Sequence, residues 1–145
     1  MYKRQLSEQA EVYADYRTTG LSLKGHPIGF HREALSQLRV LRASDLATAE
    51  NERVIKVAGI VLIRQRPATA KGITFVTLED ETGVANLIVR PEVWNRFYTI
   101  CKTTAAWIAT GKLERHSGVI NILTFRIDDL TLRIGELKTK SRDFR

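Results

Sequence analysis

The 145-residue sequence has one cysteine, three prolines and no apolar run long enough to span a bilayer. Because Cys101 has no partner, an internal disulfide is excluded, and a reducing compartment is expected. Residues 1–5 lack the apolar core of a secretion signal. These absences predict a cytoplasmic protein without a membrane partner.

Sequence signatures of catalysis and of metal binding are also missing. There is no glycine-rich phosphate loop and no recognisable nucleophile–base pair. The acidic runs at residues 79–81 and 128–129 are more typical of turn chemistry than of metal binding. His26 and His31 have no third partner at zinc-ligand spacing. We therefore expect no catalytic residue, no metal and no cofactor in this chain.

What the sequence has in excess is positive charge. It carries 23 Lys and Arg against 16 Asp and Glu, for a net charge of +7. Basic side chains neutralise phosphates and release counterions, so nucleic acid is a natural partner. A soluble domain with a basic surface has the same balance, so the residue pattern has to distinguish the two interpretations.

The pattern changes at about residue 53, where apolar residues begin to alternate with polar ones, as in half-buried strands. The expected strands cover residues 54–65, 73–80, 84–90, 104–115 and 119–127. A helix opened by Pro91 should fill residues 91–101, between the third and fourth strands, with Cys101 in the core. Gly59 and Gly111, each in the middle of a strand, indicate bends.

Three strands, a helix and two strands is the connectivity of the OB-fold, a five-stranded barrel. We therefore predict a mainly β chain with an OB-fold domain at residues 51–132. Residues 1–50 should form a helical connector, with helices near residues 6–16 and 28–38 and a further turn capped by Ser44. Residues 133–145 should form a charged, frayed tail.

The outward face of the first two strands is predicted to mix cations with an aromatic ring, a combination that suits single-stranded nucleic acid. On it we place Lys56, Arg64, Arg66, Phe75 and Thr77. The cations would bind phosphates or simply be solvated. Phe75 would stack on a base or pack under the N-terminal segment.

Other candidates lie on the neighbouring strand and in the loops. Lys71 belongs to the first loop, and Asn86 is placed centrally for hydrogen bonds to base edges. The last hairpin is the second binding loop of this fold. The complete set of candidate nucleic-acid-binding residues is Arg64, Arg66, Lys71, Phe75, Thr77, Asn86, Lys112, Arg115 and His116.

Residues 57–67, 69–72 and 75–86 closely resemble the C-terminal OB domain of bacterial error-prone DNA polymerases of the family C alpha-subunit type. The Arg-Gln-Arg-Pro loop at residues 64–67 is typical of that branch, and residues 15–27 resemble its preceding connector. Arg90 departs from the family, which usually has an aromatic residue there, and adds charge instead.

The resemblance implies a parent DNA-directed DNA polymerase that acts in damage-induced mutagenesis and translesion synthesis. It also implies that this piece is non-catalytic and lies near the single-stranded template. Its partners would be single-stranded DNA, upstream polymerase domains and accessory mutagenesis proteins. Two alternatives remain open: a tRNA-anticodon-type OB domain, and a protein-docking module of a mutagenesis complex.

Overall fold

The computed structural model describes residues 25–143, and the side chains of residues 25–137. The helix expected over residues 6–16 lies outside the described residues. So do most of residues 15–27, which resemble the connector of the family named above.

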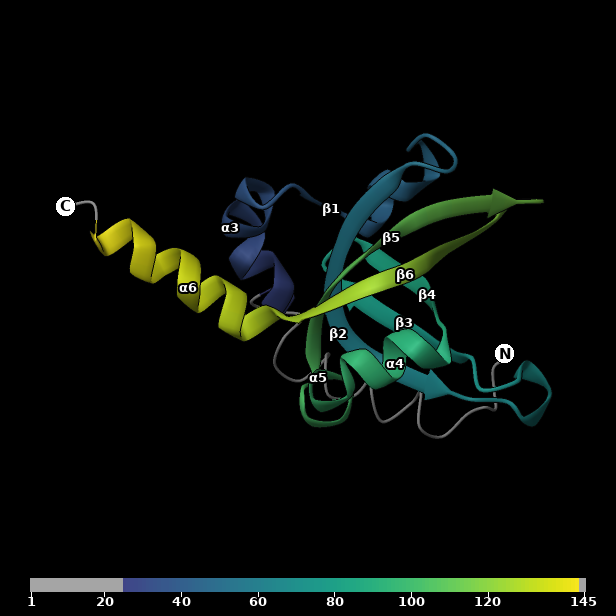
Figure 1. Cartoon of the computed structure of the whole chain (residues 1–145). Coiled ribbons are helices and arrows are strands. Elements are labelled where there is room, and N and C mark those ends of the chain that lie inside the picture. The colour runs from purple at the N-terminus through teal and green to yellow at the C-terminus, as the bar shows by residue number, and fades with distance from the viewer. Residues whose placement is uncertain (1–24, 144–145) are drawn as a thin grey trace.

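Five strands form a closed barrel (Figure 1). They are β2 (Val54–Gln65), β3 (Thr74–Asp80), β4 (Gly83–Val89), β5 (Ala106–His116) and β6 (Val119–Asp129). Their order is β2-β3-β4-β6-β5, and β5 pairs back onto β2. The β4–β6 pair is parallel and the other barrel pairs are antiparallel. The predicted five-stranded barrel is therefore confirmed.

Two strand glycines allow the barrel to close. A Cβ on Gly59 would lie 2.7 Å from the carbonyl oxygen of Glu79, closer than real Cβ atoms approach. A Cβ on Gly111 would overlap the carbonyl oxygen of Leu123. The β5–β6 register also shifts between Thr110 and Gly111. Glycine is needed at both positions because two backbones approach too closely for a side chain.

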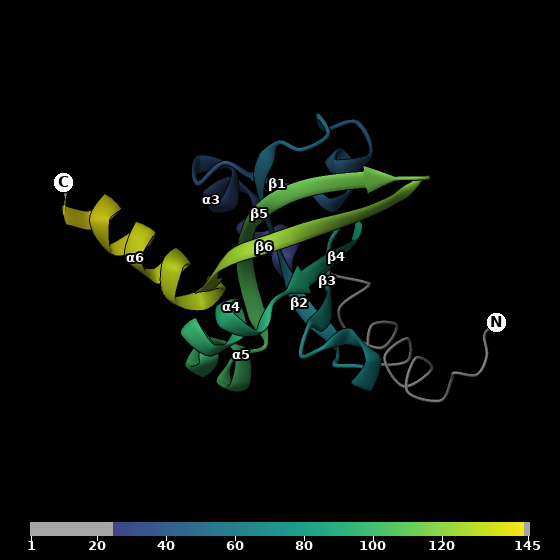
Figure 2. The same cartoon turned by 45° about the vertical axis from the view of Figure 1, so that its right-hand side comes forward.

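Two short helices lie at one end of the barrel (Figure 2). α4 (Pro91–Arg96) begins at Pro91, as expected, and α5 (Tyr98–Thr103) follows after a break at Phe97. One continuous helix was predicted, but Phe97 has φ −106° and ψ 29°, which interrupts it. Trp94 and Cys101 from these helices are buried against the barrel core.

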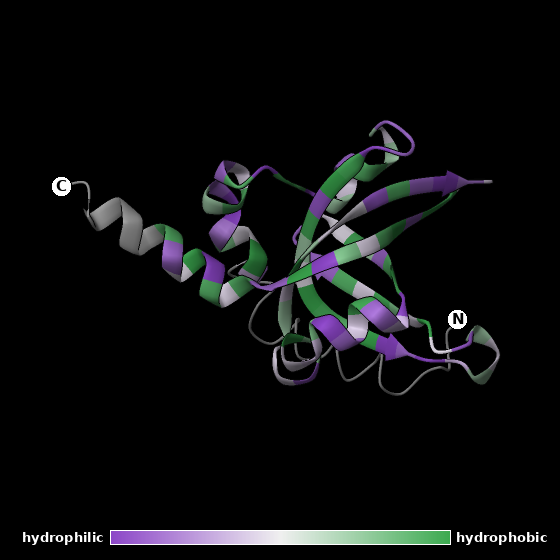
Figure 3. Ribbon diagram, viewed as in Figure 1, coloured by the Kyte–Doolittle hydropathy of each residue, from purple (hydrophilic) through white to green (hydrophobic). Residues whose placement is uncertain are grey.

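The core is the barrel interior. Its fully buried side chains include Val57, Val76, Leu87, Trp107 and Ile122, which come from all five strands. Apolar residues alternate with polar ones along the strands (Figure 3). This alternation produced the sequence prediction, and burial of one strand face explains it.

The N-terminal connector packs on the outside of the barrel. It consists of η2 (Pro27–His31), α3 (Arg32–Gln37), β1 (Val40–Leu41) and η3 (Ala43–Ala47), and β1 pairs in parallel with β2. Ser44 does not cap η3 as predicted. Its N–H donates to Oγ1 of Thr82 at 3.0 Å, and the N–H of Arg42 donates to Oδ2 of Asp45.

The last described element is α6 (Leu130–Asp143), which projects from the barrel (Figure 1). We expected a frayed tail from Arg133, so the observed helix corrects that prediction. Asp129 accepts a hydrogen bond from the N–H of Thr131 at 3.0 Å and so caps the helix. Leu130 and Ile134 are buried against Leu35, Ala58 and Ile108, which anchors its first turns. None of the helices in the described part of the chain is long and apolar enough to cross a membrane.

Candidate nucleic-acid interface

The outward face of β3 and β4 carries three of the predicted site residues. Phe75 is 38% exposed, and Thr77 lies directly opposite Asn86. The Thr77 hydroxyl donates to Oδ1 of Asn86 at 3.3 Å. The amide nitrogen of Asn86 is therefore left for a further acceptor. This face combines a flat ring with a polar pair.

Apolar side chains also lie on this outward face. Ile63 is 48% exposed. It pairs with Thr77 and therefore lies on the outward face. Ile88 pairs with Phe75, and Val84 is 49% exposed at the start of β4. We call Ile63, Phe75, Thr77, Asn86 and Ile88 the sheet face.

A bulge in β2 separates the arginines from the sheet face. The register between β2 and β3 shifts between Val61 and Ile63. One extra residue reverses which way each later side chain points. Arg64 therefore pairs with the inward-facing Val76, and Arg66 bonds to Thr74. The prediction that both arginines share the face of Phe75 is wrong.

Lys56 also lies away from Phe75. It pairs with Val40 on β1 and Thr110 on β5, and its ammonium donates to the carbonyl of Leu38 at 3.3 Å. It therefore contacts the N-terminal connector. Its predicted place beside Phe75 is wrong.

Two exposed cations, Lys71 and Arg90, flank the end of the sheet face at which Ile88 lies. Lys71 follows η4 (Ala68–Ala70) and has a left-handed backbone, with φ 55°. Arg90 follows β4 in an extended conformation. The next residues in the chain, Gly72 and Pro91, lie close together, because a Cβ on Gly72 would be 3.0 Å from Cγ of Pro91. This contact places the backbones of Lys71 and Arg90 at one corner of the barrel.

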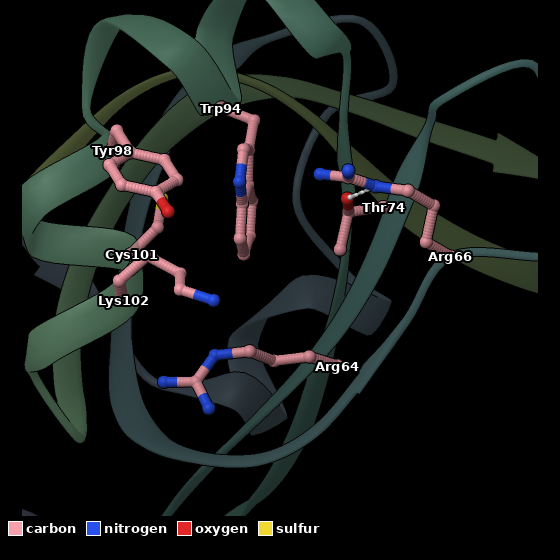
Figure 4. Close-up of a pocket in the computed structure, with 7 residues that line it drawn as sticks. All are labelled: Arg64, Arg66, Thr74, Trp94, Tyr98, Cys101 and Lys102. Carbon is pink, nitrogen blue, oxygen red and sulfur yellow. Dashed lines mark hydrogen bonds between the residues drawn. The ribbon is translucent and has the colours of Figure 1, made fainter.

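Arg64 and Arg66 instead line a cavity of about 390 Å³ between the barrel and the helices α4 and α5 (Figure 4). We call it the helix-end cavity. The residues that line it are Arg64, Arg66, Thr74, Trp94, Tyr98, Cys101 and Lys102.

Arg66 lies in the cavity wall beside the indole of Trp94. Its Nε donates to Oγ1 of Thr74 at 3.0 Å, and its guanidinium carbon lies 5.2 Å from the centre of the Trp94 ring. This distance is within the range of cation–π attraction. In Figure 4 the indole lies between Arg66 and the Tyr98 ring. The guanidinium is therefore held in place while its two terminal nitrogens remain available.

The other two cations are held in a similar way. Arg64 donates to the carbonyl of Thr104 at 3.0 Å, and its guanidinium carbon lies 5.7 Å from the centre of the Trp107 ring. The Lys102 ammonium lies 5.9 Å from the centre of the Tyr98 ring.

The remaining lining residue, Cys101, is not charged. Burial raises the pKa of Cys101 to about 11, so its thiol stays protonated at neutral pH.

Neither Lys102 nor Trp94 is among the candidate residues predicted from the sequence. The signal was present, because Trp94, Tyr98 and Lys102 recur at intervals of four residues. That spacing places residues on one side of a helix. It was overlooked because the apolar stripe through the same segment explained the helix without them.

The predicted residues of the last hairpin lie elsewhere. Lys112 is 3.9 Å from a carboxylate oxygen of Glu114, and His116 is exposed at the turn. Arg115 donates from Nη2 to the carbonyl oxygens of Leu46 and Ala49. Arg115 therefore ties the segment before β2 to the barrel, a structural role that sequence reasoning did not find.

The acidic run at the β3–β4 turn has structural partners. Oδ1 of Asp80 accepts from the N–H groups of Thr82 and Gly83 and from the Thr82 hydroxyl. Glu81 accepts two hydrogen bonds from Arg32 at 2.7 and 2.8 Å. Hydrogen bonding to Arg32 lowers the pKa of Glu81. These contacts support the interpretation as turn chemistry, and no His, Cys, Asp or Glu cluster suited to a metal occurs within residues 25–137.

The barrel order, the parallel β4–β6 pair and the helices between β4 and β5 define an OB-fold. Solved structures with this barrel share the fold at low sequence identity. Asparaginyl-tRNA synthetase from Pyrococcus horikoshii matches with a TM-score of 0.52 and 16% identity, over 61% of this chain and 22% of that chain. An OBody bound to hen egg-white lysozyme matches with a TM-score of 0.51 and 13% identity, over 63% of this chain and 91% of that chain.

Proteins with similar sequences indicate the family more specifically than the shared fold does. The error-prone DNA polymerase of Rhodopirellula baltica is 52% identical over 140 residues, which cover 97% of this chain and 12% of the relative. That of Caulobacter vibrioides is 45% identical over 88% of this chain and 12% of its own length. No protein-family model matches. The chain corresponds to a segment of error-prone DNA polymerases, about one eighth of their length, and the predicted resemblance is confirmed.

Proposed function

We propose that this chain is the single-stranded DNA-binding OB module of an error-prone DNA polymerase. It would bind template DNA largely without regard to sequence during translesion synthesis. The parent polymerase domains and accessory mutagenesis proteins would be its protein partners. The relatives' name supports the polymerase context, and the OB barrel supports binding of an unpaired strand.

The observation that carries this proposal is the exposed Phe75 ring on the sheet face. β3 and β4 are the second and third strands of the barrel, and this pair of strands is the usual oligonucleotide surface of OB-folds. A base can stack on the Phe75 ring whatever its identity. The amide of Asn86 is placed for hydrogen bonds to a base edge beside it.

Positive charge at one end of the sheet face supports a path for the DNA backbone. Lys71 and Arg90 are both exposed at the corner described above. Neither takes part in an ion pair between described side chains. Phosphates that run past Phe75 would therefore meet cations that are not already neutralised.

The proposal is tested with Phe75→Ala and a fluorescent dT oligomer. Loss of one stacking ring costs about 1–3 kcal/mol, so we expect about tenfold weaker binding by fluorescence anisotropy. Phe30→Ala is the matched control, because Phe30 is 66% exposed on η2, outside the sheet face. Its affinity for the oligomer should equal that of the parent chain.

Three results would contradict the proposal. One is equal oligomer binding by the Phe75 and Phe30 variants. A second is preference for structured tRNA over single-stranded DNA, which would support an anticodon-type function instead. Capture of a polymerase subunit without any binding of dT would support the docking alternative and likewise contradict single-strand binding.

A further inference from the structure

The helix-end cavity concentrates positive charge without a matching negative group. Arg64, Arg66 and Lys102 line it, and no carboxylate is among its lining residues. The hydrogen-bond acceptors of the two arginines are neutral groups, the carbonyl of Thr104 for Arg64 and the hydroxyl of Thr74 for Arg66. Among ion pairs between described side chains, none includes any of these cations. A cavity of this composition attracts an anion.

The cations are also ordered before any ligand arrives. Each lies over an aromatic ring, Arg66 at Trp94, Arg64 at Trp107 and Lys102 at Tyr98. Trp94 and Trp107 are only 8% and 0% exposed, so two of these rings are fixed by the core. Pre-ordered donors lose less side-chain entropy on binding than free surface lysines do.

The size and the rim of the cavity indicate more than a bare ion. A volume of about 390 Å³ lies within the range of small-molecule sites, about 300–1,000 Å³. Tyr98 is 52% exposed on α5 and offers ring surface to a base. Guanidinium groups suit the geometry of phosphate oxygens, and the Thr74 hydroxyl adds another polar group.

We propose that the helix-end cavity binds a nucleotide phosphomonoester, with its phosphate against Arg64, Arg66 and Lys102 and its base near Tyr98. A phosphomonoester carries a charge of about −1.5 to −2 at neutral pH, which matches a group of cations better than a single backbone phosphodiester does. The site shares no residue with the sheet face. Its ligand would be either a free nucleotide or the phosphorylated end of a DNA strand, and only the second source rests on the proposed function.

The test titrates the chain with dTMP and with thymidine, by calorimetry. We expect dTMP to bind and thymidine to bind at least tenfold more weakly. Lys102→Gln should weaken dTMP binding at least tenfold, because it removes a charge from an exposed side chain on α5 without altering the core. Arg66→Gln should also weaken dTMP binding. Arg133→Gln is the matched control, since it removes the same charge on α6 and should leave dTMP binding unchanged.

A second set of titrations separates the two sources. Binding of dT oligomers with and without a 5′-phosphate is compared in the parent chain and in Lys102→Gln. A gain from the 5′-phosphate that disappears in Lys102→Gln identifies a strand end. Binding of dTMP with no gain from the 5′-phosphate identifies a free nucleotide. Either result supports the cavity.

The inference is overturned if neither dTMP nor the oligomers show any dependence on the phosphate. It is also overturned if Lys102→Gln and Arg133→Gln affect dTMP binding equally. Failure of the two proposals is distinguishable, because the sheet face is tested with unphosphorylated dT and Phe75→Ala. A chain that binds dTMP but not unphosphorylated dT would refute the proposed function and retain the cavity.

Discussion

A single additional residue in β2 decides where two arginines point. The shift between Val61 and Ile63 exposes Ile63 and turns Arg64 toward the barrel end. Successive side chains of a strand point to opposite faces, so one extra residue at a bulge moves every later side chain to the other face. The result is two separate surfaces, the sheet face and the helix-end cavity, where the sequence predicted one.

At the same scale, Gly111→Ala should destabilise the barrel by about 3 kcal/mol or more. An added Cβ would overlap the Leu123 carbonyl and the Thr124 backbone, and neither is the movable end of a side chain. The free energy of unfolding is measured by urea denaturation followed by circular dichroism.

The same substitution at Gly135 is the control. Gly135 lies inside α6, and a Cβ there would meet no atom within 4 Å. Alanine is favoured over glycine in a helix by about 1 kcal/mol, so stability should stay the same or rise slightly. Equal losses for both variants would show that close packing at Gly111 does not constrain the barrel.

At the scale of elements, the β3–β4 turn helps to fix the connector to the barrel. Arg32 on α3 bonds Glu81 and lies 3.3 Å from Asp80, and Asp80 also accepts from the N–H of Ala43. His26, which precedes η2, forms a hydrogen bond with Glu79 at 3.0 Å. The acidic residues of this turn resemble a metal site in the sequence. In the structure they bind the N-terminal connector instead.

Glu81→Gln should therefore destabilise the chain by about 1–2 kcal/mol at pH 7, since a charged hydrogen bond is replaced by a neutral one. The pKa of Glu81 is lowered by Arg32 from its ordinary value of 4.5. Its contribution is accordingly complete above that value and is lost as the pH falls through the folded-state pKa. Urea denaturation from pH 7 to pH 3 should show the two chains converging in acid.

Glu136→Gln provides the comparison within an exposed pair. Glu136 lies 3.2 Å from Arg133 on α6, three residues apart. Such pairs contribute about 0.2–0.5 kcal/mol, so little change is expected at any pH. A pH-independent difference between Glu81→Gln and the parent chain would contradict the role given to Glu81.

At the scale of the whole molecule, the surplus of seven positive charges is divided among several places. Some cations serve the structure, such as Arg32 and Arg115. Others line the helix-end cavity, and Lys71 and Arg90 lie beside the sheet face. Net charge therefore overstates how many cations are available to a DNA backbone.

Affinity for a dT oligomer should fall steeply with salt, because each phosphate neutralised contributes about 0.7 to the slope of log affinity against log salt. Lys71→Ala and Arg90→Ala should each reduce that slope by about 0.7. Anisotropy across a salt series measures it, and Arg133→Ala serves as the control away from the sheet face. An unchanged slope in both variants would remove these two cations from the DNA path.

Much of the architecture was predictable from residue order alone. Alternating apolar residues predicted the five strands, Pro91 marked the helix start, and Gly59 and Gly111 marked the bends. These features are local, since strand periodicity and backbone freedom depend on neighbouring residues. The resemblance to error-prone DNA polymerases likewise came from the residue order, and the relatives confirm it.

The arrangement of the site was decided only by the tertiary structure. The bulge is set by the pairing of β2 with β3, and the cavity by where α4 and α5 close the barrel. The structural role of Arg115 depends on residues 46 and 49, which are distant from it in the chain. Such contacts depend on how separate elements meet in space, and periodicity within one segment carries no information about that meeting.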